Sequence, residues 1–254
     1  MLYRSLLYPL MAWMLASPSL AQDQTETPKF APSDLAASAS GEPDAIFKRL
    51  HDYLKSNPLD FETSFDARSL GDELYRGTAH FLIRQPNLLR IETSSGDRSY
   101  VVISDGKVLT IYNPHLRKYA QMPAPESPAA AFGLLTGEMG VESQVLNFLG
   151  AADDVVAGAE GMKVAAAGSS TIAGQQCDGF TVVDRMGDNK WEAWLEKKEV
   201  PLLCKLIYHS VDGPAQTNEF SWKPTPVFSP DTFVFSPPEG STKVDVGSLG
   251  LSPP

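Results

Sequence analysis

Hydrophobic and polar residues alternate in several short stretches between residues 61 and 122. The alternation is clearest in Phe61–Ala67 and Thr78–Arg84, where apolar side chains recur at alternate positions. A period of two residues is typical of a β-strand with one buried face. The same reasoning, with turn residues as boundaries, predicts four more strands: Leu89–Thr93, Tyr100–Ile103, Val108–Tyr112 and Arg117–Met122. Consecutive strands of this kind form an antiparallel meander with an apolar face that other elements must cover.

Helical periodicity precedes and follows the meander. Apolar residues at a helical spacing predict an amphipathic helix that starts near Pro43 and ends at Asn57-Pro58: Ile46, Leu50, Tyr53 and Leu54. After the meander, glycines interrupt three short stretches of helical pattern: Ala131–Leu135, Val141–Leu149 and Ala151–Ala159. Short interrupted helices either pack permanently on a sheet or form a cover that moves.

The strand pattern returns in the second half of the chain. Five stretches alternate and are separated by turn signals: Met162–Ala166, Phe180–Asp184, Lys190–Glu196, Leu203–Ser210 and Gln216–Trp222. Phe233–Phe235 and Lys243–Val246 are expected as edge pieces. No linker separates the two halves, so the pattern predicts one α+β domain, residues 43–246, built on a strongly curved antiparallel sheet of about 10–11 strands.

The N-terminal residues have the three parts of a secretory signal. A positive region at Arg4 and an apolar core, Leu6–Leu15, precede the small residues Ser19 and Ala21. This arrangement predicts a cleaved signal peptide over residues 1–21, followed by a flexible linker, residues 22–42. No later run approaches ~18 apolar residues, so we expect no integral membrane segment after cleavage. Residues 247–254 are expected to form a disordered tail.

Composition and charge narrow the possible partners. The 254 residues are 43% hydrophobic and 20% charged, an ordinary globular composition. The formal net charge is −10, and removing Arg4 with the signal peptide leaves −11. Nucleic-acid binding needs clustered Lys and Arg, and the basic residues of this chain are scattered. The sequence therefore argues against a nucleic-acid partner.

Cys177 and Cys204 are the only two cysteines. An oxidising exported compartment favours a disulfide between them. One predicted strand should separate them, however, which places them roughly 9–10 Å apart and beyond the reach of a disulfide. The bond requires that strand to end early, near the loop at Lys197–Pro201, and the alternative is two separate buried thiols.

Catalytic and metal-binding patterns are absent from the sequence. It contains no nucleophile elbow, phosphate loop, dinucleotide fingerprint or zinc-protease motif. The four histidines are widely separated and show no ligand spacing: His51, His80, His115 and His209. We expect neither an enzyme nor a metal site or cofactor.

Several motifs carry a resemblance to a known superfamily. They are Arg84–Arg90 (Arg-Gln-Pro-Asn-Leu-Leu-Arg), the turn Ser104-Asp105-Gly106-Lys107 and Tyr112-Asn113-Pro114. With these segments, Gly77–Pro114 resembles the outer-membrane lipoprotein carriers (LolA/LolB-like). Residues 46–246 as a whole resemble a family of periplasmic proteins of unknown function in that superfamily. The second-half motifs behind this are Trp191-x-x-Trp194-Leu195, Pro201-Leu202-x-Cys204-Lys205-Leu206, Trp222 and Phe235–Gly240.

The resemblance implies an unclosed β-barrel with a helical lid, which holds acyl chains of a lipid or lipoprotein in the periplasm. Twelve apolar residues are then candidates for lining or closing the cavity: Phe61, Phe65, Phe81, Ile83, Leu89, Ile91, Leu109, Ile111, Phe132, Leu134, Leu146 and Leu149. Plain core packing explains the same residues without a ligand.

Two points qualify the resemblance. Carriers have an Arg directly before the motif proline, whereas this chain has Gln85 there and Arg84 one place earlier. A shift of one residue sends a side chain to the opposite face of a sheet. The same fold also suits an envelope sensor or interaction module that binds a protein partner through its surface.

Overall fold

The computed structural model describes residues 42–68, 74–139, 141, 143–150, 163–183, 187, 190–210 and 213–251. The chain divides into two units between Ala37 and Ser38, and every described residue belongs to the second. The predicted signal peptide, the predicted linker up to residue 41 and the predicted helical turns at Ala151–Ala159 lie outside the described residues.

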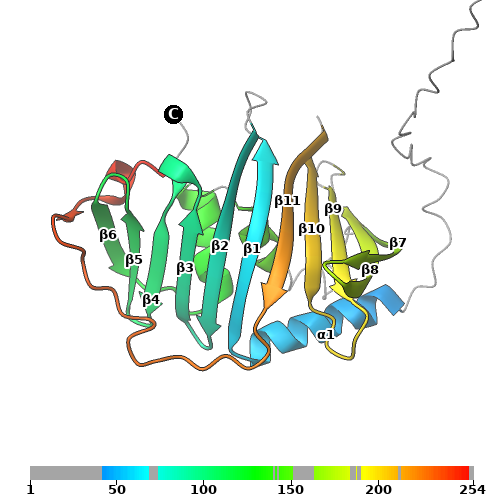
Figure 1. The fold of residues 1–254 in the computed structure, drawn as a ribbon. Coiled ribbons are helices and arrows are strands. Elements are labelled where there is room, and N and C mark those ends of the chain that lie inside the picture. The colour runs from blue at the N-terminus through cyan, green and yellow to red at the C-terminus, as the bar shows by residue number, and fades with distance from the viewer. Residues whose placement is uncertain are drawn as a thin grey trace, which may run out of the picture. The chain divides into compact units, whose positions relative to one another are not determined.

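Within the described residues, twelve strands form a single sheet, which is curved (Figure 1). Their bounds are β1 Leu59–Arg68, β2 Leu74–Arg84, β3 Leu88–Ser94, β4 Val101–Asp105, β5 Val108–Asn113, β6 Lys118–Pro123, β7 Lys163–Ile172, β8 Gln175–Val183, β9 Lys190–Glu196, β10 Leu203–Ser210, β11 Gly213–Trp222 and β12 Thr242–Lys243. The order across the sheet is β12-β6-β5-β4-β3-β2-β1-β11-β10-β9-β8-β7, with β12 and β7 at the edges. The prediction of an unclosed, curved α+β sheet is confirmed.

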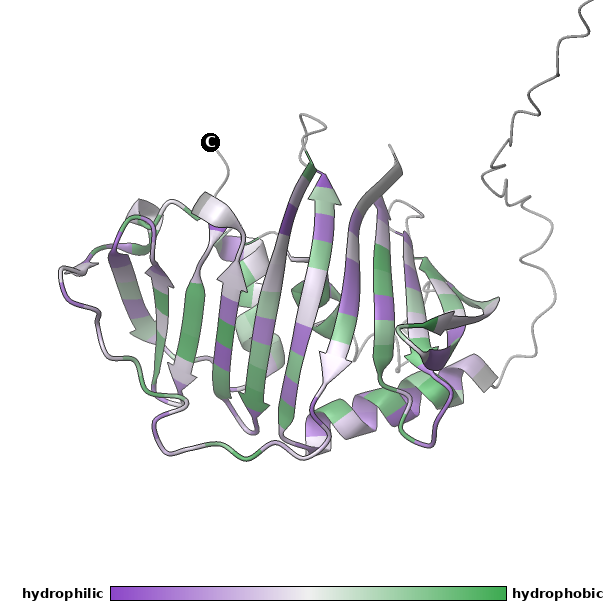
Figure 2. Ribbon diagram, viewed as in Figure 1, coloured by the Kyte–Doolittle hydropathy of each residue, from purple (hydrophilic) through white to green (hydrophobic). Residues whose placement is uncertain are grey.

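Strand β1 joins the two halves of the chain. It pairs antiparallel with β2, where Phe61 lies opposite Phe81, and with β11, where Phe61 lies opposite Trp222. The other neighbours are consecutive in the chain and antiparallel, apart from β12, which runs parallel to β6. Figure 2 shows hydrophobic and hydrophilic residues alternating along β1 and its neighbours. This alternation is the period-two pattern that predicted the strands.

Three short helical segments cover one face of the sheet, which we call the concave face. They are α2 Pro128–Gly133, the π-helical turn η3 Leu134–Glu138 and α3 Gln144–Gly150, drawn as green coils behind the sheet in Figure 1. Helix α2 begins at Ser127, whose hydroxyl accepts a hydrogen bond from the amide of Ala130 at 3.1 Å. Pro128 follows at the first helical position, where its missing N–H costs nothing.

Helix α1, Glu42–Ser56, lies along one end of the sheet (Figure 1). Its buried side chains include Phe47, Leu50 and Leu54, and the Phe47 ring meets Phe180 of β8 edge-on at 5.5 Å. The helix predicted from residue 43 is present. Phe47, which the predicted apolar face omitted, is its largest buried side chain.

The segment after β11 (orange in Figure 1) runs past the lower strand ends towards the β6 edge and packs against the opposite, outer face of the sheet. Arg90 of β3 donates a hydrogen bond from Nη1 to the Thr232 carbonyl at 3.1 Å. The Phe235 ring lies 5.9 Å from Tyr112 and 5.2 Å from Tyr119. Phe233–Phe235 is therefore a covering segment and not the expected edge strand. The segment contacts β3 on one side of β4 and β5 and β6 on the other. The outer face of β4 is therefore covered as well, which explains why β4 is apolar on both faces.

The C-terminal residues are placed as far as Leu251, beyond the point where a disordered tail was expected. A 3₁₀ turn, η4, spans Val246–Ser248. Leu249 is fully buried in the main core, and its carbonyl accepts a hydrogen bond from Asn113 Nδ2 at 2.9 Å. One apolar side chain and one carbonyl therefore hold this segment to the end of β5, a contact that local composition does not reveal.

Candidate ligand-binding face of the sheet

The predicted lining residues on the strands share the concave face. Strand register places Phe61, Phe81, Ile91, Val102 and Ile111 opposite one another in an unbroken row across β1 to β5. A second row starts at Ile83 and includes Leu89 and Leu109. Because side chains alternate between faces along a strand, these rows form one largely apolar surface. The buried Ser104 interrupts the second row between Leu89 and Leu109.

The structure brings eleven of the twelve predicted residues into one hydrophobic cluster. Ten are buried against neighbouring side chains: Phe61, Phe81, Ile83, Leu89, Ile91, Leu109, Ile111, Phe132, Leu146 and Leu149. Leu134 is half-buried and packs against the cluster. Phe65 is also half-buried, lies outside the cluster and meets the Tyr75 ring edge-on at 6.2 Å.

An aromatic group stands at the centre of the concave face. The Phe61 ring stacks on Phe81 at 4.7 Å and lies 4.3 Å from Trp222 and 5.9 Å from Phe220. The Trp222 indole donates a hydrogen bond to the Leu203 carbonyl at 2.8 Å. Phe220 and Trp222 share a face of β11, and their contact with Phe61 depends on the β1–β11 pairing.

The helical segments that cover the sheet bury more side chains than the sequence predicted as closing residues. Phe132, Leu146 and Leu149 are joined by four further buried residues that contact the same cluster: Leu135, Met139, Val145 and Phe148. The sequence could have indicated these four residues, because each is apolar and lies within about one helical turn of a predicted residue. The helical segments therefore cover the sheet with a continuous apolar surface.

Gly77 of β2 allows close packing beside Phe65. A Cβ atom at this position would lie 2.6 Å from the Phe65 ring and 2.5 Å from the Ser94 carbonyl oxygen. We expect Gly77→Ala to lower the free energy of unfolding by about 1–3 kcal/mol, because the backbone of β3 cannot yield cheaply. Urea denaturation measures the change. Gly137→Ala, where a Cβ would meet nothing within 4 Å, is the control.

Near Phe65, further aromatic residues line the end of the sheet. The guanidinium of Arg98 lies over the Tyr75 ring at 4.5 Å. Burial raises the pKa of the Tyr100 hydroxyl above its ordinary value, and the nearby Tyr75 raises it further.

The two residues that depart from the carrier motif have separate roles. Arg84 lies against the covering segment of the outer face, with its guanidinium 5.6 Å from the centre of the Phe233 ring. Gln85 instead donates from Nε2 to the Leu54 carbonyl of α1 at 3.5 Å. The arginine of this chain stands one residue earlier than in the carriers, and a shift of one residue turns a side chain to the other face of a sheet. We therefore expect Arg84 to contact the outer-face segment, as it does.

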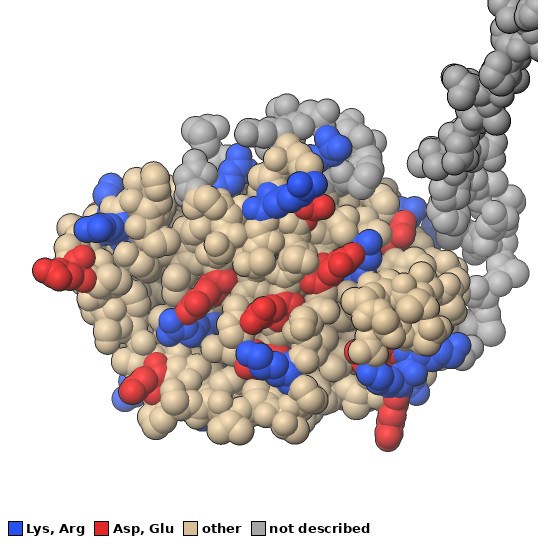
Figure 3. Space-filling view, viewed as in Figure 1, with Lys and Arg blue, Asp and Glu red and all other residues tan. Residues whose placement is uncertain are grey.

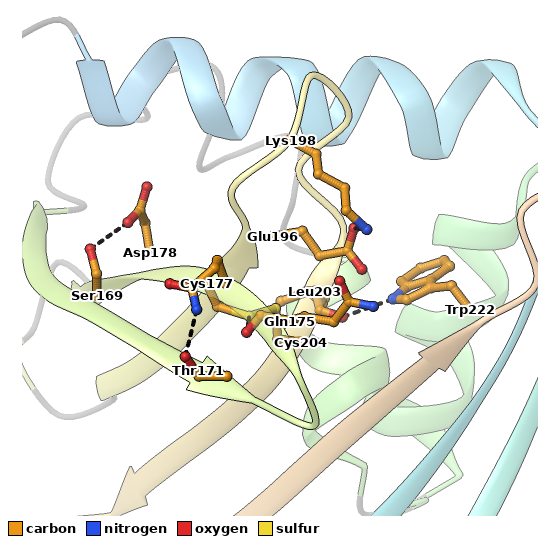
Figure 4. Close-up of a disulfide and its surroundings, with 11 residues drawn as sticks. Ser169, Thr171, Gln175, Cys177, Asp178, Glu196, Lys198, Leu203, Cys204 and Trp222 are labelled. Carbon is orange, nitrogen blue, oxygen red and sulfur yellow. Dashed lines mark hydrogen bonds and ion pairs between the residues drawn. A yellow bond between two sulfur atoms is a disulfide. The ribbon is translucent and has the colours of Figure 1, made fainter.

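Cys177 and Cys204 form a disulfide, with Cα atoms 6.7 Å apart (Figure 4). Cys177 lies opposite Glu196, the last residue of the intervening strand β9. The pairing of β10 with β9 shifts register between Leu203 and Lys205, on either side of Cys204. Strand β9 ends at Glu196, so the disulfide joins β8 to β10 just beyond the end of β9. This is the strand end that the disulfide required.

A cavity of about 370 Å³ lies beside the disulfide, between α1 and the β9–β10 connection. Apolar side chains border it, among them Ile46, Phe180 and Leu195, together with charged residues such as Arg49 and Lys198. None of the twelve predicted lining residues borders this cavity. By strand register Phe180 and Leu195 lie on the same face as Phe61, so the cavity lies at the α1 end of the concave face, away from the predicted lining residues.

The outer face carries charges of both signs, interspersed among uncharged atoms (Figure 3). Arg76 Nε lies 2.7 Å from Asp66 Oδ1, and Arg90 Nε lies 2.6 Å from Glu92 Oε1. His80 Nε2 lies 2.7 Å from Asp60 Oδ1, and His209 Nε2 lies 2.9 Å from Glu192 Oε1. Such pairs between exposed or half-buried groups contribute little to stability.

Two negative findings apply to the described ranges alone. Within them, no three His, Cys, Asp or Glu residues come together as a group that could hold a metal ion. No helix in the same ranges has the length and apolar character needed to cross a bilayer.

Several solved structures are similar to this chain. A conserved protein from Thermus thermophilus has a TM-score of 0.48 and 11% identity, covering 80% of this chain and 99% of that one. LprF from Mycobacterium bovis has a TM-score of 0.47 and 10% identity, and the alignment covers 78% of this chain and 100% of LprF. A chain of the Pseudomonas aeruginosa MucA/MucB complex has a TM-score of 0.44 and 13% identity, and the alignment covers 73% of this chain and 59% of that chain. Similarity at this level carries no argument about what the chain binds.

Family membership rests on the sequence itself. No curated protein is significantly similar to the chain. Residues 44–247 match a family described as "Predicted periplasmic protein (DUF2092)". The match spans the whole sheet, the covering helices and the outer-face segment, including the motifs from Gly77 to Pro114 and from Trp191 to Gly240. The chain therefore belongs to the DUF2092 family of predicted periplasmic proteins.

Proposed function

We propose that this protein binds the acyl chains of a lipid or lipoprotein on its concave face and carries them through the periplasm without chemistry. The observation that supports this most is the nature of the cover. Besides helix α1, which packs at one end, the apolar sheet face is covered by segments of only 6, 5 and 7 residues. Segments this short are marginal helices in isolation, so their contacts with the sheet hold them in place.

The energetics of the concave face favour a cover that exchanges with a ligand. Apolar surface exposed to water costs about 25 cal/mol per Å², so the face must be covered when no ligand is present. An acyl chain on the same surface would bury it equally well. In the proposed mechanism, α2, η3 and α3 move away from the sheet as the acyl chain enters, and contacts with the ligand replace those lost.

The lining residues in this mechanism are the twelve predicted from the sequence, joined by Trp222 and Phe220. Ten of the twelve are buried, which is the state expected of a closed lid over an unliganded face. The signal peptide would direct the protein to the periplasm. No catalytic step and no cofactor enters the proposal.

Loosening the cover should speed ligand uptake. Leu149→Ala in α3 removes a lid contact and shifts the population towards the open form by about tenfold or more. Leu54→Ala in α1 is the matched control, since Leu54 and Leu149 are both 9% exposed. We expect Leu149→Ala to take up cis-parinaric acid several times faster than the native protein, and Leu54→Ala to match the native rate. Stopped-flow fluorescence measures both.

Two results would contradict the proposed function. If native protein purified from the periplasm contains no lipid and takes up no acyl probe, the carrier role is wrong. If both alanine variants change the uptake rate equally, the effect reflects general loss of stability and α3 is not part of a lid.

A second candidate is an interaction module that binds a protein partner. Strand β7 favours it, because it is a ten-residue edge strand with mostly exposed or half-buried residues. Its outer side has no neighbouring strand among those described, and such an edge can accept an added strand. Native mass spectrometry separates the two functions. A carrier retains lipid, whereas a module retains a stable protein partner and no lipid.

A further inference from the structure

Four buried polar side chains interrupt the apolar concave face, and two of them, Ser104 and Asn113, donate hydrogen bonds to backbone carbonyls. The other two are Thr63 and Asn218. Thr63 stands between Phe61 and Phe65 on β1 and is 2% exposed. Asn218 stands two residues before Phe220 on β11 and is 1% exposed. Both belong to the face on which Phe61 and Trp222 meet, because Phe65 pairs with Asn218 and Thr63 pairs with Phe220.

Each of these residues has a buried polar atom with no hydrogen-bond partner among the described residues: Oγ1 of Thr63 and Nδ2 of Asn218. The neighbours do not supply one. Ala79, opposite Thr63 on β2, and Leu206, opposite Asn218 on β10, are apolar. A buried donor without a partner is costly, so two such groups side by side call for a ligand group that satisfies them.

A chain of hydrogen bonds orients Asn218. The backbone amide of Gln144, at the start of α3, donates to Gln216 Oε1 at 3.3 Å. Gln216 Nε2 donates in turn to Asn218 Oδ1 at 3.1 Å. The Asn218 carbonyl oxygen is thereby engaged, and its NH₂ group remains as a donor. Because this series of hydrogen bonds starts at Gln144 in α3, the orientation of Asn218 is coupled to a helix that covers the concave face.

The two donors are close enough to share one acceptor. Thr63 and Asn218 are diagonal neighbours across the β1–β11 pair, which places such residues roughly 7–8 Å apart, with their side chains on the same face. The Thr63 hydroxyl and the Asn218 amide can both donate to one oxygen lying between them. Around that point the surface is apolar, because Phe65 and Phe220 occupy the other diagonal of the same four paired residues.

We infer that Thr63 and Asn218 form a polar anchor for the carbonyl oxygen of an acyl chain. This inference rests on the proposed function and names the ligand class: an ester- or amide-linked acyl chain. The anchor supplies two neutral donors, which suit a neutral carbonyl. An ionised fatty acid carries a full charge into the same apolar surroundings, where two neutral donors compensate it poorly.

Competition between an ester and an alkane tests the anchor. The full protein is equilibrated with equal amounts of methyl hexadecanoate and octadecane, and the bound ligands are extracted and measured by gas chromatography. Thr63→Val and Asn218→Leu each remove a donor while keeping the approximate size of the side chain. We expect each to lower the ester-to-alkane ratio by about tenfold, with alkane binding unchanged. A parallel arm with hexadecanoic acid at neutral pH should show weaker binding than the ester.

Thr110→Val is the matched control. Thr110 is also 2% exposed, but it lies on the opposite face of the sheet, where its hydroxyl accepts a hydrogen bond from Gln121 Nε2 at 3.2 Å. Its ester-to-alkane ratio should equal that of the native protein. Thr63→Val should also keep or raise the melting temperature, because it removes an unpartnered buried hydroxyl, whereas a purely structural hydroxyl would lower it on removal.

The possible results separate the anchor from the proposed function. If both ligands bind but the ratio is the same in the native protein and in Thr63→Val and Asn218→Leu, the anchor is wrong and acyl binding stands. If hexadecanoic acid binds more tightly than the ester, the ligand class is wrong. If the native protein takes up neither ester nor alkane, the proposed function fails and the anchor fails with it.

Discussion

Phe61→Ala should lower the free energy of unfolding by about 3–5 kcal/mol, the largest effect that we expect of a single substitution. Phe61 is fully buried and contacts the rings of Phe81, Phe220 and Trp222. These rings lie on three adjacent strands, β2, β1 and β11, so truncation leaves a cavity where the two halves of the sheet join. Urea denaturation followed by tryptophan fluorescence measures the loss.

Phe228→Ala is the comparison for this prediction. Phe228 is half-buried, lies in the outer-face segment and meets Phe233 edge-on at 5.2 Å. Its truncation should cost less than half as much, because the site is open to solvent and no enclosed cavity remains. A loss at Phe61 no greater than that at Phe228 would mean that the β1–β11 junction is not the centre of the core.

Removing the disulfide should have the second-largest effect. The double variant Cys177→Ala/Cys204→Ala is expected to lose about 3.5 kcal/mol of stability, since the bond closes a chain segment with a sequence separation of 27. The bond also joins β8 to β10 beyond the end of β9, although these two strands are not neighbours in the sheet. Urea denaturation of the native protein with and without a reducing agent gives the same difference.

The reducing agent supplies an internal control for this prediction. It should lower the denaturation midpoint of the native protein and leave the midpoint of the double variant unchanged. Equal midpoints for native protein and double variant under oxidising conditions would show that the bond contributes nothing to folding. A reductant effect on the double variant would point to a cause other than this bond.

Much of the fold follows from local pattern. Alternation predicted the core of β1 to β6 and of β9 to β11, and helical spacing predicted α1. These elements could be predicted because each buries one face, and a buried face imposes its period on the sequence. Strand β7 has no such signal beyond Ala166: it continues to Ile172 through small and polar residues, since it lies at an edge and buries little.

The candidate site could be predicted only in part. The apolar residues of the concave face were found because they repeat every second position, yet Phe65 shares that pattern and lies outside the cluster. Thr63 and Asn218 carried no signal of their own. Their significance depends on the β1–β11 pairing, which joins residues far apart in the sequence.

The amino-acid sequence by itself determined the elements, the apolar face and the family, because periodicity, turn residues and motifs are properties of neighbouring positions. Only the tertiary structure decided which elements meet: β11 beside β1, the C-terminal segment across the outer face, and the disulfide past the end of β9. The physical reason is that pairing between distant strands is chosen by the combined burial of many side chains, and no local stretch of sequence contains that sum.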